Sequence, residues 1–296
     1  IDIIQVLRFL AAMLVVGVHL PPIGMGHFGV DLFFVISGFI MAYTTAENPP
    51  SATTFLRKRI VRVVPLYWVM TLLVFAVMPL MGARSDSLPE LVQSLLFLPF
   101  DNDGQGHVPV LFVGWTLNYE MLFYALFALA LALGARIAGT ALMIGAVVLT
   151  CMALAPAIPI FALEAWASPI LFEFVFGMAI WAFLSGQGSA YQMSVMTSMI
   201  VLCIGLCAMT ESWRAVTSGL PAAILVWAAL RWVGTVRLPS AITILGGASY
   251  ALYLTHAFVI GAVERTSGPL DTLAMAAGVS VICVAVSLAV YFWVER

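Results

Sequence analysis

The sequence predicts an all-α, polytopic membrane protein with about ten transmembrane helices and with the N- and C-termini in the cytoplasm. Three observations predict this fold. Hydrophobic residues make up 63% of the 296 residues, and the mean hydropathy is +1.10. Only 9% of the residues are charged, compared with about 25% in a soluble domain. Apolar runs of about 20 residues, enough to cross a bilayer, follow one another along the chain. We therefore expect residues 1–296 to form one integral-membrane domain without a separate soluble domain.

These runs define the expected spans in chain order, with one shorter apolar piece between the third and the fourth. The ten spans cover residues 3–21, 28–46, 63–82, 111–134, 138–155, 168–185, 191–209, 215–233, 240–263 and 271–293. The apolar piece within 83–110 is too short to span, so we expect an interfacial or re-entrant helix there, followed by a polar loop.

The distribution of basic residues sets the orientation. With the N-terminus inside, the inner loops contain most of the cations, namely Arg57, Lys58, Arg59, Arg62, Arg136, Arg231, Arg237 and Arg296. The outer loops contain only Arg84, Arg214 and Arg265. This bias fits the positive-inside rule. The chain has one lysine and a net charge of −2, so it has no basic surface for nucleic acid.

Four cysteines lie in apolar stretches, and none forms a CxxC pair: Cys151, Cys203, Cys207 and Cys283. Cys203 and Cys207 are one helical turn apart, which could look like half a metal site. Small apolar residues in a helix are the better interpretation. We therefore expect no disulfide, no metal and no permanently bound cofactor.

Arg8 and His19 lie in the first apolar segment, eleven positions apart. At about 100° per residue they share a helix face, separated by about 16 Å along the axis. An arginine within a membrane span is costly and tends to mark function. A cation and an imidazole at two depths could hold the two ends of a long, charged molecule.

The expected topology places further ionisable residues at the depth of His19, in the outer half of the membrane. These residues are Asp31, Glu120, Glu173 and His256. Histidine titrates near neutral pH, and a buried carboxylate can orient it, stabilise its charged form or take the proton itself. These side chains either share one polar site or each reach the nearer membrane interface. A shared site is favoured for His19 with Glu120, and the two interpretations have equal weight for His256. The interface is favoured for Asp31 and is open for Glu173.

The basic segment RKRIVR, residues 57–62, has three interpretations of equal weight. It is a solvated inner loop, a site for anionic lipid headgroups, or a site for the phosphates of a cytosolic ligand.

Five sequence blocks resemble the membrane acyltransferase 3 family, of the exopolysaccharide and O-antigen O-acetyltransferase type. The blocks are Arg8 with His19, FGVDLFFVISGFIM at 28–41, FLRKRIVRVVPLYW at 55–68, GWTLNYEMLFY at 114–124 and ASYALYLTH at 248–256. They occur in order over nearly the whole chain. The closing Val-Glu-Arg is similar to the family's end segment, although the proline expected after it is missing.

The resemblance implies ten spans, an acyl-CoA donor on the cytoplasmic side and a carbohydrate hydroxyl acceptor on the other side of a bacterial inner membrane. It implies that Arg8, His19 and Glu120 matter for activity, with support from Arg59 and Arg62. Many family members carry an extracytoplasmic hydrolase-like domain. We see none in this sequence, which favours direct transfer to a glycan.

We expect the three arginines to bind the phosphates of acetyl-CoA, His19 to act as general base and Glu120 to offset the positive charge that His19 acquires. An acyl-histidine intermediate is an open variant. Residues considered for supporting roles are Asp31, Ser37, Trp115, Tyr124, Tyr253 and His256. Packing is at least as good an explanation for the two tyrosines.

Two other functions remain open. A proton-coupled transporter or flippase could use the same intramembrane polar residues, although no internal repeat supports it. A lipid-binding scaffold could use RKRIVR, but it would give His19 and Glu120 no role. The expected partners are an acyl-CoA, a carbohydrate and the lipid bilayer, and the sequence leaves open whether the chain forms a homo-oligomer.

Overall fold

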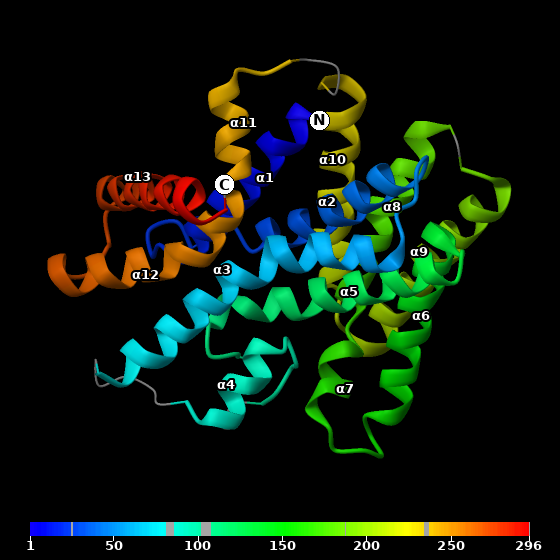
Figure 1. The fold of residues 1–296 in the computed structure, drawn as a ribbon, viewed down its shortest axis with the longest axis horizontal. Coiled ribbons are helices and arrows are strands. Elements are labelled where there is room, and N and C mark those ends of the chain that lie inside the picture. Colours follow the sequence, from blue (N-terminus) through cyan, green and yellow to red (C-terminus); the bar gives the residue numbers. More distant parts are fainter. Residues whose placement is uncertain (25, 81–85, 102–107, 187, 234–236, 296) are drawn as a thin grey trace. The chain divides into compact units, whose positions relative to one another are not determined.

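The computed structural model describes residues 1–24, 26–80, 86–101, 108–186, 188–233 and 237–295, and in these ranges it contains helices and loops without strands (Figure 1). The chain forms two compact units. Unit 1 comprises Ile1–Ile36 and Pro221–Arg296, and unit 2 comprises Ser37–Leu220. Each unit is described by itself. The expectations for Arg84, for Arg296 and for the polar loop at 102–107 fall outside the described residues.

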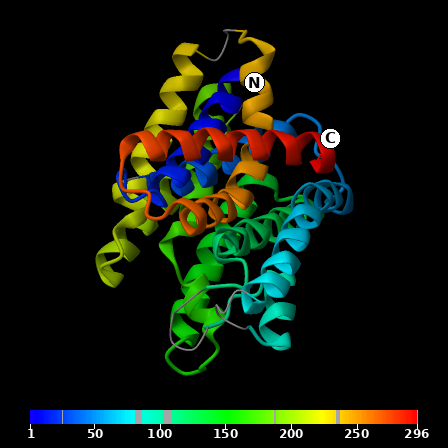
Figure 2. The same ribbon diagram turned by 90° about the vertical axis from the view of Figure 1, so that its left-hand side faces the viewer.

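Unit 1 is built on the first helix, α1, which packs against α11 and α12, while α12 packs against α13 (Figures 1 and 2). Its elements are α1 (Asp2–Val18), the first half of α2 (Phe28–Thr45), nearly all of α10 (Leu220–Val233), α11 (Ser240–Gly247), α12 (Ser249–Ser267), α13 (Leu273–Val290) and the π-helix η4 (Tyr291–Glu295). One hydrophobic core joins α1, α12 and α13: Ala12, Val16, Leu20, Leu252, Ile260, Leu270, Ala276, Val279 and Cys283.

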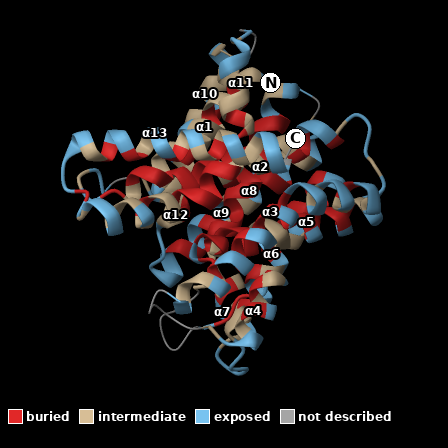
Figure 3. Ribbon diagram, turned by 60° about the vertical axis from the view of Figure 1, so that its left-hand side comes forward, coloured by how far each residue is buried: buried red, intermediate tan, exposed pale blue. Residues whose placement is uncertain are grey.

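Unit 2 contains the second half of α2 and most of the middle helices. They are α3 (Ala52–Leu80), α4 (Leu88–Leu95), η1 (Phe112–Gly114), α5 (Trp115–Ala132), α6 (Arg136–Leu154), α7 (Phe161–Trp166), η2 (Pro169–Leu171), α8 (Phe172–Ser185), α9 (Ala190–Thr210) and the π-helix η3 (Ala215–Gly219). Helix α8 is apolar around nearly its whole surface, apart from Glu173, and is buried from Phe172 to Ala182 (Figure 3), as expected for a helix surrounded by others.

Glycine allows the backbones of two helix pairs to approach closely. A Cβ on Gly29 would lie 2.4 Å from the Ala11 carbonyl oxygen within unit 1. One on Gly38 would lie 2.0 Å from the Phe174 carbonyl oxygen within unit 2. Each glycine thus permits a close contact between helix backbones within its own unit.

The expected helical fold is confirmed, whereas the count of ten spans stays a prediction. Every expected span contains a helix. Seven helices among the described residues are long and apolar enough to cross a membrane, or up to eight if α11 and α12 form one span. Helix α1 has 17 residues and is not among these seven. The orientation of the termini also stays a prediction.

The expected span 240–263 is broken. Helices α11 and α12 meet at Ala248 with a bend of 61°. The break directly follows Gly246 and Gly247, and helix kinks are common at such small residues. A Cβ on Gly246 would lie 2.3 Å from the Gln5 carbonyl oxygen of α1, so this glycine is also needed for close packing.

The short apolar piece in 83–110 forms helix α4, which is tied to α3. Ser87 caps the N-terminus of α4 in a capping box with Glu90. The Tyr67 hydroxyl donates to the Ser94 carbonyl oxygen at 3.1 Å, and Trp68 Nε1 donates to the Leu95 carbonyl oxygen at 2.8 Å. The predicted short helix is confirmed, and side-chain hydrogen bonds hold it in place.

Candidate active site

His19 lies directly after the last residue of α1, not inside the helix as we expected. The helix ends at Val18, and Pro21 and Pro22 follow. Proline disfavours helical backbone in the residue before it and has no N–H to donate, which explains the early end. The backbone N–H of His19 bonds to the Val16 carbonyl oxygen at 3.1 Å.

The imidazole of His19 takes part in the end of its own helix. Val15 is among the last residues of α1, whose carbonyl groups lack helical N–H partners. His19 Nδ1 lies 2.9 Å from the Val15 carbonyl oxygen. A histidine at a helix C-terminus can donate to such carbonyl groups, and this contact fixes the ring of His19 relative to α1.

His256 on α12 lies beside this ring. His256 Nε2 is 3.3 Å from His19 Nδ1, and the ring centroids are 4.9 Å apart at an interplanar angle of 57°. His256 Nδ1 is 3.2 Å from the Leu252 carbonyl oxygen. His256 is fully buried, whereas His19 is half-buried. The structure thus brings together two of the predicted residues, and we call them the histidine pair.

Aromatic packing surrounds the buried member of the pair. The centroid of the Tyr253 ring lies 6.1 Å from that of His256. Phe33 meets Tyr253 edge to face, with the centroids 5.9 Å apart. The Tyr253 ring therefore packs beside the His256 imidazole, and its supporting role stays a prediction.

A second cluster in unit 2 is built around Glu120 on α5. The Ser37 hydroxyl of α2 donates to Glu120 Oε1 at 3.2 Å, and the Tyr124 hydroxyl, one turn along α5, donates to the same oxygen at 2.5 Å. Glu120 Oε2 accepts no hydrogen bond from any described residue. We call Ser37, Glu120 and Tyr124 the carboxylate cluster. It presents one fixed oxygen and one available oxygen of a half-buried carboxylate.

Arg59 on α3 connects the basic segment to this cluster. Its guanidinium carbon lies 5.6 Å from the centroid of the Phe55 ring and 6.0 Å from that of Tyr124. Its Nε is buried and has no hydrogen-bond acceptor among the described residues. Arg62 lies on the same helix and is exposed. A buried guanidinium N–H without an acceptor suits an anionic ligand.

The predicted site residues are divided between the two units. Unit 1 contains Arg8, His19, Asp31, Tyr253 and His256, while unit 2 contains Ser37, Arg59, Arg62, Trp115, Glu120 and Tyr124. Arg8 is half-buried on α1. The pairing of His19 with Glu120 joins residues of different units, so it stays a prediction from the sequence.

The interpretation favoured for Asp31, that its side chain reaches the nearer interface, is wrong, and burial excludes the same alternative, which the sequence left open, for Glu173. Both side chains are fully buried. Asp31 is in the first turn of α2, two residues after the close contact at Gly29. Glu173 lies against the π-helix η3, where a Cβ on Gly219 would be 2.8 Å from Glu173 Cγ. Neighbouring helices enclose these short side chains, which cannot extend past them as lysine or arginine can.

Trp115 has a cationic neighbour that the sequence analysis missed. The guanidinium carbon of Arg214 lies 5.6 Å from the centroid of the Trp115 ring, and Tyr119 meets Trp115 edge to face at 6.1 Å. We had assigned Arg214 only to an outer loop. No local spacing links it to Trp115, because the two residues are far apart in the chain. The interaction gives Trp115 a structural role in unit 2.

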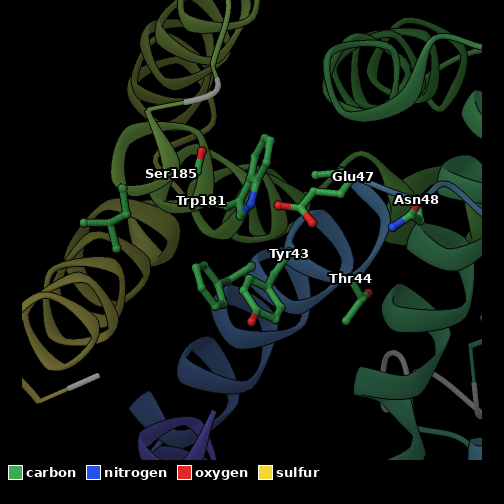
Figure 4. Close-up of a pocket in the computed structure, with 9 residues that line it drawn as sticks. Tyr43, Thr44, Glu47, Asn48, Trp181 and Ser185 are labelled. Carbon is green, nitrogen blue, oxygen red and sulfur yellow. The ribbon is translucent and has the colours of Figure 1, made fainter. Parts of the chain in front are cut away.

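A cavity of about 470 Å³ opens where α2 and α8 end in unit 2 (Figure 4). Its lining combines aromatic, polar and acidic side chains: Phe39, Tyr43, Thr44, Ala46, Glu47, Asn48, Trp181, Leu184 and Ser185. No cation occurs among the described residues that line it, and Glu47 would repel an anion. This cavity therefore does not suit the phosphates of a donor molecule, unlike the surroundings of Arg59.

Comparison with known proteins assigns the family. The family model described as "Acyltransferase domain" matches residues 1–294. This chain belongs to the acyltransferase 3 family. Membership fits the half-buried histidine and carboxylate, which are groups suited to acyl transfer.

Two curated relatives support this assignment. The chain is 33% identical to the exopolysaccharide production protein ExoZ of Rhizobium meliloti (strain 1021), over 81% of this chain and 78% of that protein. It is 29% identical to the acyltransferase MdmB of Streptomyces mycarofaciens, over 82% of this chain and 70% of that protein. No solved structure matches the chain significantly. The family resemblance predicted from the five sequence blocks is thus confirmed.

Proposed function

We propose that this acyltransferase moves an acyl group, acetyl in the simplest case, from acyl-CoA to a hydroxyl group of an extracytoplasmic or lipid-linked glycan. The observation that carries this proposal is the half-buried imidazole of His19, fixed by two contacts in a protein of the acyltransferase 3 family. The similarity to ExoZ, named for exopolysaccharide production, supports a glycan as the acceptor.

His19 acts as the general base in this mechanism. It takes the proton of the acceptor hydroxyl while that oxygen attacks the thioester carbonyl carbon. A carbon–oxygen bond forms, the carbon–sulfur bond breaks, and the CoA thiolate leaves. The proton on His19 then passes to this sulfur, which gives free CoA and regenerates the neutral imidazole.

Glu120 is the second group that we propose to be required. Hydrogen bonds from Ser37 and Tyr124 hold one oxygen of its carboxylate in place. An ionised carboxylate can offset the positive charge that a general base acquires during the reaction. If both groups are required, Glu120→Gln should abolish transfer as His19→Ala does. Full transfer by folded Glu120→Gln would remove Glu120 from the mechanism.

We propose Arg59, Arg62 and Arg8 as the donor-binding cations. Arg59 supports this role through its buried Nε without an acceptor, and a guanidinium fork matches phosphate geometry. Arg62 lies one turn further along α3. Arg8 is the cation of α1, and its role rests on the sequence.

The decisive experiment follows the acyl group. Protein in nanodiscs receives acetyl-CoA labelled in the acetyl group, together with cell-envelope glycan, and label in the glycan is counted. We expect transfer by wild type and by His27→Ala, a substitution of an exposed loop histidine, and no transfer by His19→Ala. Full transfer by folded His19→Ala would overturn the general-base role. Absence of transfer with every acyl-CoA tried, together with transport of a solute, would favour a transporter.

A further inference from the structure

The contacts of His19 Nδ1 with the Val15 carbonyl oxygen and with His256 indicate which ring nitrogen of His19 carries the proton. Oxygen atoms of carbonyl groups can only accept hydrogen bonds. His19 Nδ1 lies 2.9 Å from the Val15 carbonyl oxygen, and His256 Nδ1 lies 3.2 Å from the Leu252 carbonyl oxygen. Each contact is a hydrogen bond only if the Nδ1 atom carries a proton. In the neutral state, both rings are therefore Nδ1–H tautomers.

The contact between the rings agrees with this assignment. When His256 Nδ1 carries the proton, His256 Nε2 has a lone pair and can only accept. Its neighbour at 3.3 Å is His19 Nδ1, whose N–H is then shared between Val15 and His256. All three contacts are satisfied by one arrangement of protons.

The opposite arrangement has a high cost. If His256 Nε2 donated to His19 Nδ1, both Nδ1 atoms would present lone pairs to carbonyl oxygens at 2.9 and 3.2 Å. Two hydrogen bonds would be replaced by two repulsive contacts, at a fully buried ring and a half-buried ring. Buried polar groups without partners are strongly disfavoured.

We propose that His256 is a positioning residue that holds His19 in the Nδ1–H tautomer, so that His19 Nε2 is the nitrogen that takes the proton in acyl transfer. The assignment of Nε2 as the base rests on the proposed function, whereas the tautomer itself does not. His256 does not touch the substrate in this account. Its lone pair orients the His19 ring and accepts more strongly when His19 becomes an imidazolium.

The proposed role of His256 is similar to that of the carboxylate in a catalytic triad, except that His256 is a neutral group. In such a triad a carboxylate accepts from the histidine and fixes its tautomer. Here a buried imidazole and a helix-end carbonyl share that task. The Val15 carbonyl group can accept a hydrogen bond from the His19 ring because α1 ends at Val18. The early end of the helix therefore contributes to fixing the tautomer.

The tautomer can be measured without any activity. The chain contains four histidines, and protein labelled with ¹⁵N-histidine gives imidazole signals that separate protonated from unprotonated ring nitrogens. Single substitutions of His19, His27 and His256 assign the signals. We expect His19 to be protonated on Nδ1 and not on Nε2 in the neutral wild-type protein. Neutral His19 protonated on Nε2 would overturn the proposal.

Two substitutions of His256 separate the acceptor from the rest of the ring. The amide nitrogen of His256→Asn occupies the place of Nδ1 and keeps the bond to Leu252, but the acceptor at Nε2 is lost. In His256→Gln an amide oxygen reaches the place of Nε2 and keeps the acceptor. We expect His256→Asn to lower kcat roughly tenfold with an unchanged donor KM and a mixed His19 tautomer. His256→Gln should recover most of kcat and the Nδ1–H tautomer.

Equal kcat values for the asparagine and glutamine variants would contradict the positioning role. Size-exclusion profiles serve as the control that both variants are folded. If either variant fails to fold, the spectrum of the wild-type protein still tests the assigned tautomer of His19. The test also separates this proposal from the proposed function. A His19→Ala protein with full transfer activity would remove the general-base role, while the tautomer measured in wild type would stand.

Discussion

The clearest chemistry at the residue scale is the difference between the two oxygens of Glu120. Oε1 accepts from both Ser37 and Tyr124, so the carboxylate is held in one orientation. A hydrogen bond to a charged group contributes more than one between neutral groups. Loss of one donor should therefore reduce activity without removing the carboxylate.

Tyr124→Phe removes that donor and keeps the ring that packs near Arg59 and Phe55. We expect kcat to fall about tenfold, because loss of the hydrogen bond that orients the carboxylate should raise the activation free energy by roughly 1.4 kcal/mol. The matched control is Tyr119→Phe on the same helix, whose hydroxyl donates to the Ala165 carbonyl oxygen at 2.9 Å. It should change thermal stability and leave kcat near wild type. Equal kcat values for the two variants would contradict the role of the carboxylate cluster.

A second prediction concerns the donor-binding arginines. Arg59→Lys keeps the charge but loses the planar fork, so we expect the KM for acyl-CoA to rise severalfold with little change in kcat. Arg8→Lys should behave in the same way if Arg8 also meets the donor. Steady-state kinetics with varied acyl-CoA measures both. A wild-type KM in either variant would remove that arginine from the donor site.

The sequence could predict contacts at this scale only where the local spacing sets them. Tyr124 lies four residues after Glu120, and helix geometry alone puts them on one face. Ser37 with Glu120 and His19 with His256 come from distant segments, so only the tertiary fold joins them. The burial of Asp31 was missed for the same reason, because its own segment does not reveal which helices cover it.

The element scale is governed by close contacts between backbones. Gly38→Ala would place a Cβ against the Phe174 carbonyl oxygen, where neither backbone can move easily. We expect a loss of about 1–3 kcal/mol in stability, as for other overpacked cores. The control is Gly205→Ala in α9, where a Cβ would have nothing within 4 Å and helix propensity improves. Thermal unfolding in detergent measures both, and equal melting temperatures would contradict the packing account.

Most helices were predictable at the element scale because long apolar runs are a strong signal. The errors have local physical causes. Helix α1 ends before Pro21, and the span expected at 240–263 breaks after two glycines. Average hydropathy does not report such breaks, because proline and glycine act through backbone geometry.

At the scale of the whole molecule, the central prediction is the orientation of the chain in the membrane. The positive-inside bias predicts that Ser51 is cytoplasmic and that Ser87 is on the opposite side. Both positions are exposed, and the four native cysteines are buried, so single introduced cysteines give a clean signal. In sealed right-side-out vesicles an impermeant thiol reagent should label Ser87→Cys and not Ser51→Cys. The reverse labelling pattern would show that the topology is opposite to the predicted one.

Acyl transfer from CoA by His19 is the central claim, and release of free CoA tests it most directly. A thiol reagent suits this protein because its four cysteines are buried. Wild type, His19→Ala and His27→Ala would be compared with acetyl-CoA, with and without envelope glycan. We predict that wild type and His27→Ala release CoA faster when glycan is present, while His19→Ala releases none above background. Release at the wild-type rate by folded His19→Ala would contradict the account.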